Sequence, residues 1–171
     1  MFKAGIITVS DKGSQGKRQD LSGPAIAEML AGAAIQIRKT LIIPDEVDQI
    51  SEAIIQFADI EKLDLILTTG GTGVSPRDLT PDATRKVIDK DVPGMAEAMR
   101  YASMKITPHA MISRAVAGIR GRCLIINLPG SPKAARENLA VVLPALQHAI
   151  EKMKGDDRDC ATSLQGPVGI A

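Results

Sequence analysis

The sequence predicts an α/β protein of three layers, in which helices cover both faces of a mostly parallel central sheet with one antiparallel edge strand. Short runs of β-branched and aliphatic residues alternate along the chain with segments whose apolar residues recur at helical spacing. The order strand, helix, strand, helix, strand also requires crossover connections, which join parallel strands and place helices on both faces of the sheet.

Three strands are expected in the first half of the chain. Residues 5–9 are uncharged and rich in β-branched side chains, as in a strand buried on both faces. In residues 26–33 apolar side chains recur at positions i, i+3, i+4 and i+7, which predicts a helix with one apolar face. Residues 35–43 are expected to form the second strand, residues 47–58 a second helix, and residues 64–68 a third strand.

Two helix starts in the second half have the same form, a hydroxyl residue followed by proline. Thr80 and Ser131 are expected to cap these helices, because their side chains accept hydrogen bonds from free amides and proline suits the first helical position. The helix after Ser131 is expected to extend to about Lys154, and Pro144 should kink or break it.

A further helix and a hairpin are expected between these two starts. Pro93 and Gly94 should end the helix that Thr80 begins, with another helix over residues 95–104. Residues 113–118 and 122–128 are expected to flank a β-hairpin turn at residues 119–121, which predicts one antiparallel strand at the edge of the sheet.

Length and composition favour a single domain over residues 1–154, followed by a flexible tail over residues 155–171. The chain has 171 residues, 44% of them hydrophobic, which suffices for a sizeable core. Its 21 basic and 20 acidic residues nearly balance, so a nucleic-acid partner is not expected. No apolar run is long enough for a membrane span, and the two cysteines have no metal or disulfide spacing, so we expect a cytoplasmic protein.

The candidate site follows from the predicted sheet, because ligands of open parallel sheets bind beyond the carboxyl ends of the strands. Polar, acidic or glycine-rich residues follow every predicted strand, and we expect them to converge on one edge. These residues are Ser10 and Asp11 after the first strand, Asp45 after the second, Thr69, Gly70, Gly71, Thr72, Gly73, Asp78 and Asp82 after the third, and Pro129, Gly130 and Ser131 after the last.

The glycine-rich loop is the strongest of these signals. Three glycines within residues 70–73 indicate a main chain that adopts positive φ or lies against a ligand. Successive exposed amides in such a loop form an anion site suited to phosphate. The loop matches neither the Walker A pattern, because no lysine follows the glycines, nor the dinucleotide pattern. A tight turn without a ligand is the alternative.

Acidic residues beside a phosphate site suggest Mg²⁺, which prefers oxygen ligands and retains several waters. Asp45 and Asp78 are the candidates, with Asp45 alternatively a helix cap and Asp78 a solvated loop charge. Asp82 is also explained as an acid in the first turn of a helix. Asp11 could orient a substrate or cap the following turn. Ser131 opens a helix whose N-terminus could bind an anion, and capping alone explains it equally well.

These motifs, taken together, resemble those of molybdenum-cofactor biosynthesis proteins of the MogA branch, which includes the gephyrin G domain and its plant counterpart. The resemblance rests on Ser10-Asp11, Ile43-Pro44-Asp45-Glu46, the run from Thr68 to Gly73 continued by Arg77 to Thr84, and Asn127 to Pro132. It covers about residues 3–154 in the expected order.

The resemblance implies a molybdopterin adenylyltransferase, which converts ATP and molybdopterin to adenylylated molybdopterin and pyrophosphate with Mg²⁺. It places Asp45 and Asp78 on the family's two critical acids, the glycine loop on its pterin and phosphate site, and Ser131 on its second binding loop. We expect Asp78 to help ligate Mg²⁺. The resemblance further implies a homotrimer, and a molybdenum insertase is a possible partner.

Three other functions remain open from the sequence. One is a pterin-binding protein of the MoaB branch without catalytic activity, although Pro44-Asp45-Glu46 and Thr80-Pro81-Asp82 are both present. Another is a scaffolding role of the kind that gephyrin allows, which there involves additional domains. The third is a nucleotide pyrophosphatase on the same fold, which would use water in place of molybdopterin.

Overall fold

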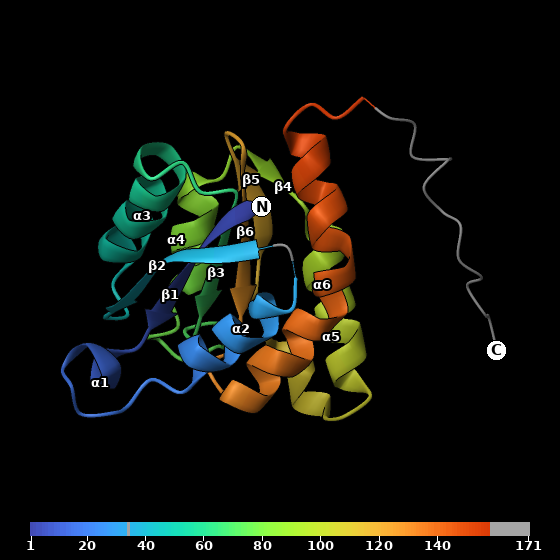
Figure 1. Cartoon of the computed structure of the whole chain (residues 1–171). Helices are drawn as coiled ribbons and strands as arrows, with labels where there is room; N and C mark the ends of the chain where they lie inside the picture. Colours follow the sequence, from blue (N-terminus) through green and yellow to red (C-terminus); the bar gives the residue numbers. More distant parts are fainter. Residues whose placement is uncertain (34, 158–171) are drawn as a thin grey trace.

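A six-stranded sheet runs through the centre of the computed structural model, which describes residues 1–33 and 35–157 (Figure 1). Its strands, in the order across the sheet, are β2 (Ile35–Ile43), β1 (Phe2–Val9), β3 (Leu65–Thr69), β6 (Cys123–Leu128), β5 (Ala117–Arg120) and β4 (Lys90–Asp91). The first four are mutually parallel, whereas β5 is antiparallel to both β6 and β4. The predicted fold class is confirmed, and the short strand β4 was not predicted.

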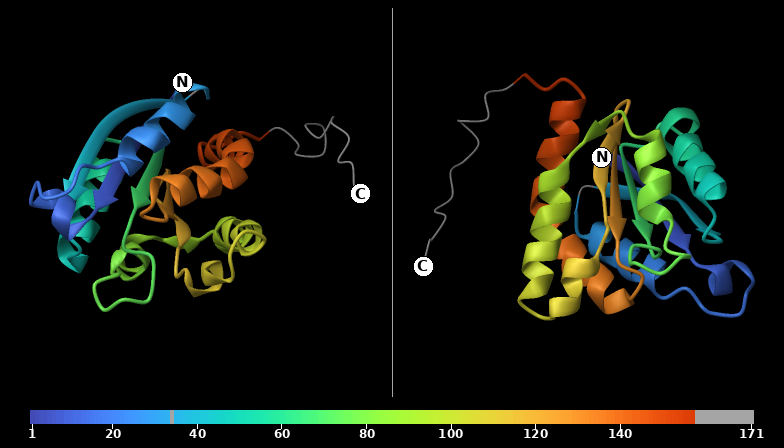
Figure 2. Two further views of the ribbon diagram at one scale, coloured as in Figure 1. Left: turned by 90° about the horizontal axis from the view of Figure 1, so that it is seen from below. Right: turned by 180° about the vertical axis from the view of Figure 1, so that it is seen from behind.

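Helices cover both faces of the sheet, as the views from below and behind show (Figure 2). One face carries α2 (Ser22–Ala31), α5 (Pro93–Met104) and α6 (Pro132–Met153). The other carries α3 (Val47–Ile55), the π-helical turn η1 (Gln56–Ile60) and α4 (Thr80–Val87). The remaining elements are α1 (Asp11–Ser14), which follows β1, and the 3₁₀ helix η2 (Pro108–Ile112), which follows α5.

The core divides into two apolar clusters because successive side chains of a strand point to opposite faces. In β3, Leu65 and Leu67 pack with α2, α5 and α6, whereas Ile66 packs with α3 and α4. Gly5 in β1 leaves room for the Phe57 ring, since a Cβ at Gly5 would lie 2.4 Å from it. Both faces of the central strands are therefore buried, as their continuous apolar sequences predict.

Helix α6 has the expected extent, and the boundary between α4 and α5 differs from the expectation. Helix α6 continues through Pro144 and changes direction along its length, in agreement with the expected kink (Figure 1). Helix α4 ends at Val87, and Pro93 begins α5 where it was expected to end the preceding helix. Strand β4 lies between α4 and α5 along the chain and pairs with β5.

The remaining expectations concern the chain ends and membranes. Most of the expected tail, residues 158–171, lies outside the described residues. No helix within the described part of the chain is long and apolar enough to cross a bilayer.

Candidate active site

A cavity of about 550 Å³ lies at the carboxyl ends of β1, β3 and β6. The parallel register of these three strands brings their following loops together at one edge of the sheet. Predicted residues that line the cavity are Ser10, Thr69, Gly70, Gly71, Asp45, Asp78, Gly130 and Ser131. The structure therefore gathers eight of the predicted site residues, from four separate loops, around one space.

The glycine loop has the backbone conformation that the sequence suggested. Gly70 and Gly71 adopt φ values of 101° and 63°, which L side chains rarely adopt. A Cβ at Gly70 would lie 2.3 Å from the carbonyl oxygen of Val9, and one at Gly71 would lie 2.5 Å from Thr80 Oγ1. The glycine loop also approaches the loop after β6 closely, since a Cβ at Gly130 would lie 3.2 Å from Gly70 Cα.

Thr80 fixes this loop instead of capping α4. Its hydroxyl donates to the Gly70 carbonyl oxygen at 2.8 Å, and its amide donates to the Gly71 carbonyl oxygen at 3.1 Å. The residue before α4 is Leu79, and no side chain caps the helix there. The prediction that Thr80 is an N-cap is therefore wrong, because its hydroxyl is buried against the loop and serves the loop's carbonyl.

Asp11 and Asp45 exchange hydrogen bonds between the loops after β1 and β2. The Asp11 amide donates to Asp45 Oδ2 at 2.9 Å, and the Asp45 amide donates to Asp11 Oδ1 at 3.0 Å. Glu46 precedes α3 and no side chain caps that helix, so the alternative that Asp45 is a helix cap is wrong. Burial raises the pKa of Asp45, and the negative charges of Asp11 and Asp78 raise it further.

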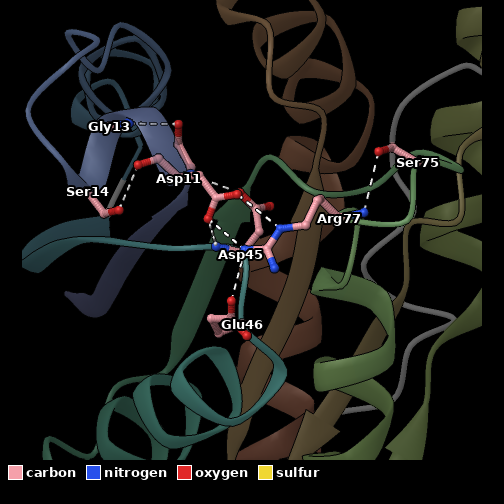
Figure 3. A network of polar contacts seen from close by, with 8 residues as sticks. Asp11, Gly13, Ser14, Asp45, Glu46, Ser75 and Arg77 are labelled. Carbon is pink, nitrogen blue, oxygen red and sulfur yellow. Dashed lines mark hydrogen bonds and ion pairs between the residues drawn. The ribbon is translucent and has the colours of Figure 1, made fainter.

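Arg77 joins three of the loops through one guanidinium group (Figure 3). It donates from Nε and Nη2 to the two oxygens of Asp11, at 3.1 and 2.9 Å, and from Nη2 to Glu46 at 2.9 Å. The bonds from Arg77 lower the pKa of Asp11, and the hydrogen bond that Asp11 accepts from the Asp45 amide lowers it further. Asp11 thus lies beside the cavity with its carboxylate held by Arg77, and Ser10, not Asp11, caps α1 by accepting from Gly13.

Asp78 and Asp45 line the candidate site together with a third acid, Asp20. Asp78 Oδ2 accepts from the Ser75 amide at 2.8 Å, which holds the carboxylate in its own loop, and a Cβ at Gly73 would lie 2.8 Å from that oxygen. No group of three or more His, Cys, Asp or Glu residues in the described ranges could hold a metal. Two carboxylates nevertheless fit Mg²⁺, which binds through one or two carboxylates together with substrate phosphates.

Ser131 acts as a cap and also faces the cavity. Its hydroxyl accepts from the Ala134 amide at 3.2 Å at the start of α6, as predicted. Because Ser131 and Pro132 line the cavity, the first turn of α6 is directed at it. A helix N-terminus favours anions, so the two interpretations of Ser131 are compatible.

Besides Asp11, four predicted residues are not part of the cavity lining. Thr72, Gly73 and Pro129 line a neighbouring cavity of about 250 Å³ between α5, η2 and α6. Asp82 accepts from Arg114 Nη2 with both oxygens, at 2.5 and 2.6 Å. Arg114 also donates to the Asp78 carbonyl oxygen, so this pair supports the loop that carries Asp78.

The loop between α1 and α2 supplies cavity residues that the sequence did not single out. These are Arg18, Gln19, Asp20, Leu21 and Ser22. Asp20 accepts from the Thr8 hydroxyl at 2.7 Å and from the amides of Ser22 and Gly23 at 3.0 Å each. The signal available in the sequence was an aspartate placed just before a Ser-Gly-Pro helix start, where it satisfies free amides.

An open parallel sheet with a glycine-rich loop, two carboxylates and a helix N-terminus at its carboxyl edge defines an α/β protein equipped for phosphorylated ligands. Residues 5–148 match the family model described as "Probable molybdopterin binding domain". The chain belongs to this molybdopterin-binding family.

Relatives and solved structures agree with that assignment. Molybdopterin adenylyltransferase of Helicobacter pylori J99 is 44% identical over 154 residues, which cover 89% of this chain and 88% of that protein. Gephyrin of Dictyostelium discoideum is 47% identical over 156 residues, or 85% of this chain, but this chain spans only 22% of gephyrin. The crystal structure of the molybdopterin biosynthesis enzyme MoaB from Thermus thermophilus is 54% identical, with a TM-score of 0.87 and coverage of 91% of this chain and 98% of that one.

Proposed function

We propose that this chain is a molybdopterin adenylyltransferase, which transfers the adenylyl group of ATP to molybdopterin and releases pyrophosphate. One observation carries the proposal: the cavity brings the Gly71 amide together with the carboxylates of Asp45 and Asp78, while the Gly70 amide fixes the loop by donating to the Leu128 carbonyl oxygen at 3.1 Å. The Helicobacter relative, which this chain spans almost entirely, bears this name.

The transfer requires positioning and charge neutralisation more than a covalent nucleophile. A terminal phosphate oxygen of molybdopterin attacks the α-phosphorus of ATP in line, and the bond from that phosphorus to the bridging oxygen of the β-phosphate breaks. Both electrons of that bond leave with pyrophosphate. The Gly71 amide holds a phosphoryl oxygen, while Asp45, fixed by the Asp11 amide, orients the second substrate.

Mg²⁺ belongs to the proposal as well. Asp78 would hold it, with Asp45 completing the metal shell if it does not orient the second substrate. The ion supplies charge neutralisation for the triphosphate. Replacing Asp78 with Asn keeps the size but removes the charge, and we expect kcat to fall on the order of 100-fold. Steady-state pyrophosphate release measures this, and unaltered turnover would remove Asp78 from the mechanism.

The assembly, partner and location are proposed on the same basis. We propose a homotrimer in the cytoplasm that delivers its product to a molybdenum insertase. Exposed apolar side chains on and after α5, among them Tyr101, Met104 and Ile106, are available for contacts between subunits.

The test is pyrophosphate release from ATP and Mg²⁺, with and without molybdopterin. We expect release only when the pterin is present, and a pterin product that carries AMP. Release without the pterin would indicate the pyrophosphatase. Pterin binding without release would indicate the non-catalytic pterin-binding protein.

A further inference from the structure

The cavity lining carries more negative than positive side chains, although the proposed substrates are themselves negatively charged. Three carboxylates line it, those of Asp20, Asp45 and Asp78, whereas Arg18 is the one basic residue among the described residues of the lining. A phosphate monoester carries a charge of about −1.5 to −2 at neutral pH, and a triphosphate carries more. Two such ligands would enter a space in which the protein presents mainly negative side chains.

The other charged groups at the cavity already have partners within the protein. Asp20 accepts three hydrogen bonds from Thr8, Ser22 and Gly23. The guanidinium of Arg77, beside the cavity, is occupied by Asp11 and Glu46. The exposed side chain of Arg18, by contrast, forms no hydrogen bond or ion pair with any part of the chain that the structure describes. Its five donors remain available to a ligand.

The loop that carries Arg18 is anchored beside the N-terminus of α6. The Ser22 hydroxyl donates to the Gly130 carbonyl oxygen at 2.7 Å, and Asp20 fixes the same loop to β1 through the Thr8 hydroxyl. Arg18 precedes Asp20 by two residues and lines the cavity together with Ser131 and Pro132. A cationic side chain thus adjoins the N-terminus of α6, whereas Asp45 and Asp78 come from the loops after β2 and β3.

We propose that Arg18 is a substrate-binding residue that donates hydrogen bonds to phosphoryl oxygens in this cavity. The proposal rests on the proposed function in one respect, that both substrates carry phosphate. The guanidinium group matches phosphate through two parallel N–H bonds, and such charge-assisted bonds are stronger than neutral ones. The phosphate belongs to either the ATP triphosphate or molybdopterin, and kinetics with each substrate varied separately distinguish the two.

The kinetic test compares Arg18→Met with Arg18→Lys and with Lys17→Met. Lys17 is adjacent and exposed but is not among the lining residues, so Lys17→Met removes one charge from the same loop without touching the cavity. We expect Arg18→Met to raise KM for one substrate about tenfold, with a smaller change in kcat. Arg18→Lys should recover part of the loss, and Lys17→Met should leave both constants unchanged. A rise in KM for ATP assigns the triphosphate, and a rise for molybdopterin assigns the pterin phosphate.

A binding measurement separates this proposal from the proposed function. Calorimetry with ATP, inorganic pyrophosphate and molybdopterin, each without metal, should show at least one ligand whose Kd rises about tenfold in Arg18→Met but not in Lys17→Met. That result supports the role of Arg18 even if the wild-type protein transfers no adenylyl group. Equal Kd and KM values in the wild type and Arg18→Met would overturn it while leaving the adenylyltransferase intact, as would equal losses in Arg18→Met and Lys17→Met.

Discussion

Single residues at this site work through hydrogen bonds that cross from one loop to another. The exchange between Asp11 and Asp45 fixes the position of the Asp45 carboxylate, and Asp45 as a residue is only 9% exposed. Arg77 in turn holds Asp11, so the position of a proposed substrate-orienting acid depends on an arginine that does not line the cavity. Small displacements of such groups are costly for a transfer that relies on alignment.

Arg77→Met tests this dependence. Methionine cannot donate to Asp11 or Glu46, so we expect kcat/KM for adenylyl transfer to fall about tenfold, with little change in the thermal unfolding temperature because the pair is exposed. Arg77→Lys should restore only part of the rate, since an ammonium group lacks the planar fork.

Arg136→Met is the matched control for this change. Arg136 forms a comparably exposed ion pair with Glu28, away from the cavity. We expect this variant to match the wild type in both activity and unfolding temperature. If the Arg77→Met enzyme were as active as the Arg136→Met enzyme, the bonds from Arg77 to Asp11 and Glu46 would not be needed for adenylyl transfer.

At the scale of elements, the glycine loop after β3 is the part whose geometry is most restricted. Gly71 has positive φ, and its missing Cβ leaves space for Thr80 Oγ1 and for Asp45 Oδ1, which would lie 2.5 and 2.9 Å from it. The loop and the nearby acid are therefore packed against each other. Any side chain at Gly71 would therefore both strain the backbone and displace Asp45.

A pair of alanine variants separates these two effects. Gly121 in the β5–β6 turn also has positive φ, but a Cβ there would meet nothing within 4 Å. We expect Gly121→Ala to lower the free energy of unfolding by about 1–2 kcal/mol, the cost of the left-handed conformation, and to leave activity unchanged. Gly71→Ala should cost more and abolish activity. Urea unfolding measures both variants, and equal losses in the two would contradict the close packing at Gly71.

Elements with a strong periodic signal could be predicted from the sequence. Strand β2 has the predicted bounds, residues 35–43, because its apolar residues alternate with polar ones. Strands β1 and β3 agree closely, because continuous apolar runs need burial on both faces. Strand β4 has two exposed residues, and its pairing with β5 depends on the tertiary fold. No local pattern could indicate it. Thr80 failed as a predicted cap for a similar reason, since the Gly70 carbonyl oxygen competes for its hydroxyl only in the folded chain.

The candidate site could be predicted in part for the same physical reason. Asp45, Asp78 and the glycine loop follow strands, and the parallel sheet brings the strand ends together at the cavity. Asp82 was placed with them by sequence, but its carboxylate pairs with Arg114, which lies 32 residues further along the chain. Arg18 was missed because a lone arginine in a polar loop has no distinguishing pattern before the loop is anchored to Gly130 by Ser22.

At the scale of the whole molecule, the sheet positions the cavity at the carboxyl ends of its parallel strands. Two apolar clusters fill its two faces, and loops and helix starts form the cavity at the carboxyl edge of β1, β3 and β6. At that edge Asp45 and Asp78 on two loops meet Gly71, the N-terminus of α6 and Arg18. This arrangement provides separate places for a cation and for phosphoryl oxygens within one cavity, as a transfer between two phosphorylated substrates requires.

The most direct measurement is a crystal structure of the protein with adenylylated molybdopterin. We expect the phosphates of the product to lie in the 550 Å³ cavity, within hydrogen-bond distance of the Gly71 amide and close to Asp45 and Asp78. A product bound instead in the cavity between α5, η2 and α6, with no contact to either acid, would contradict the account.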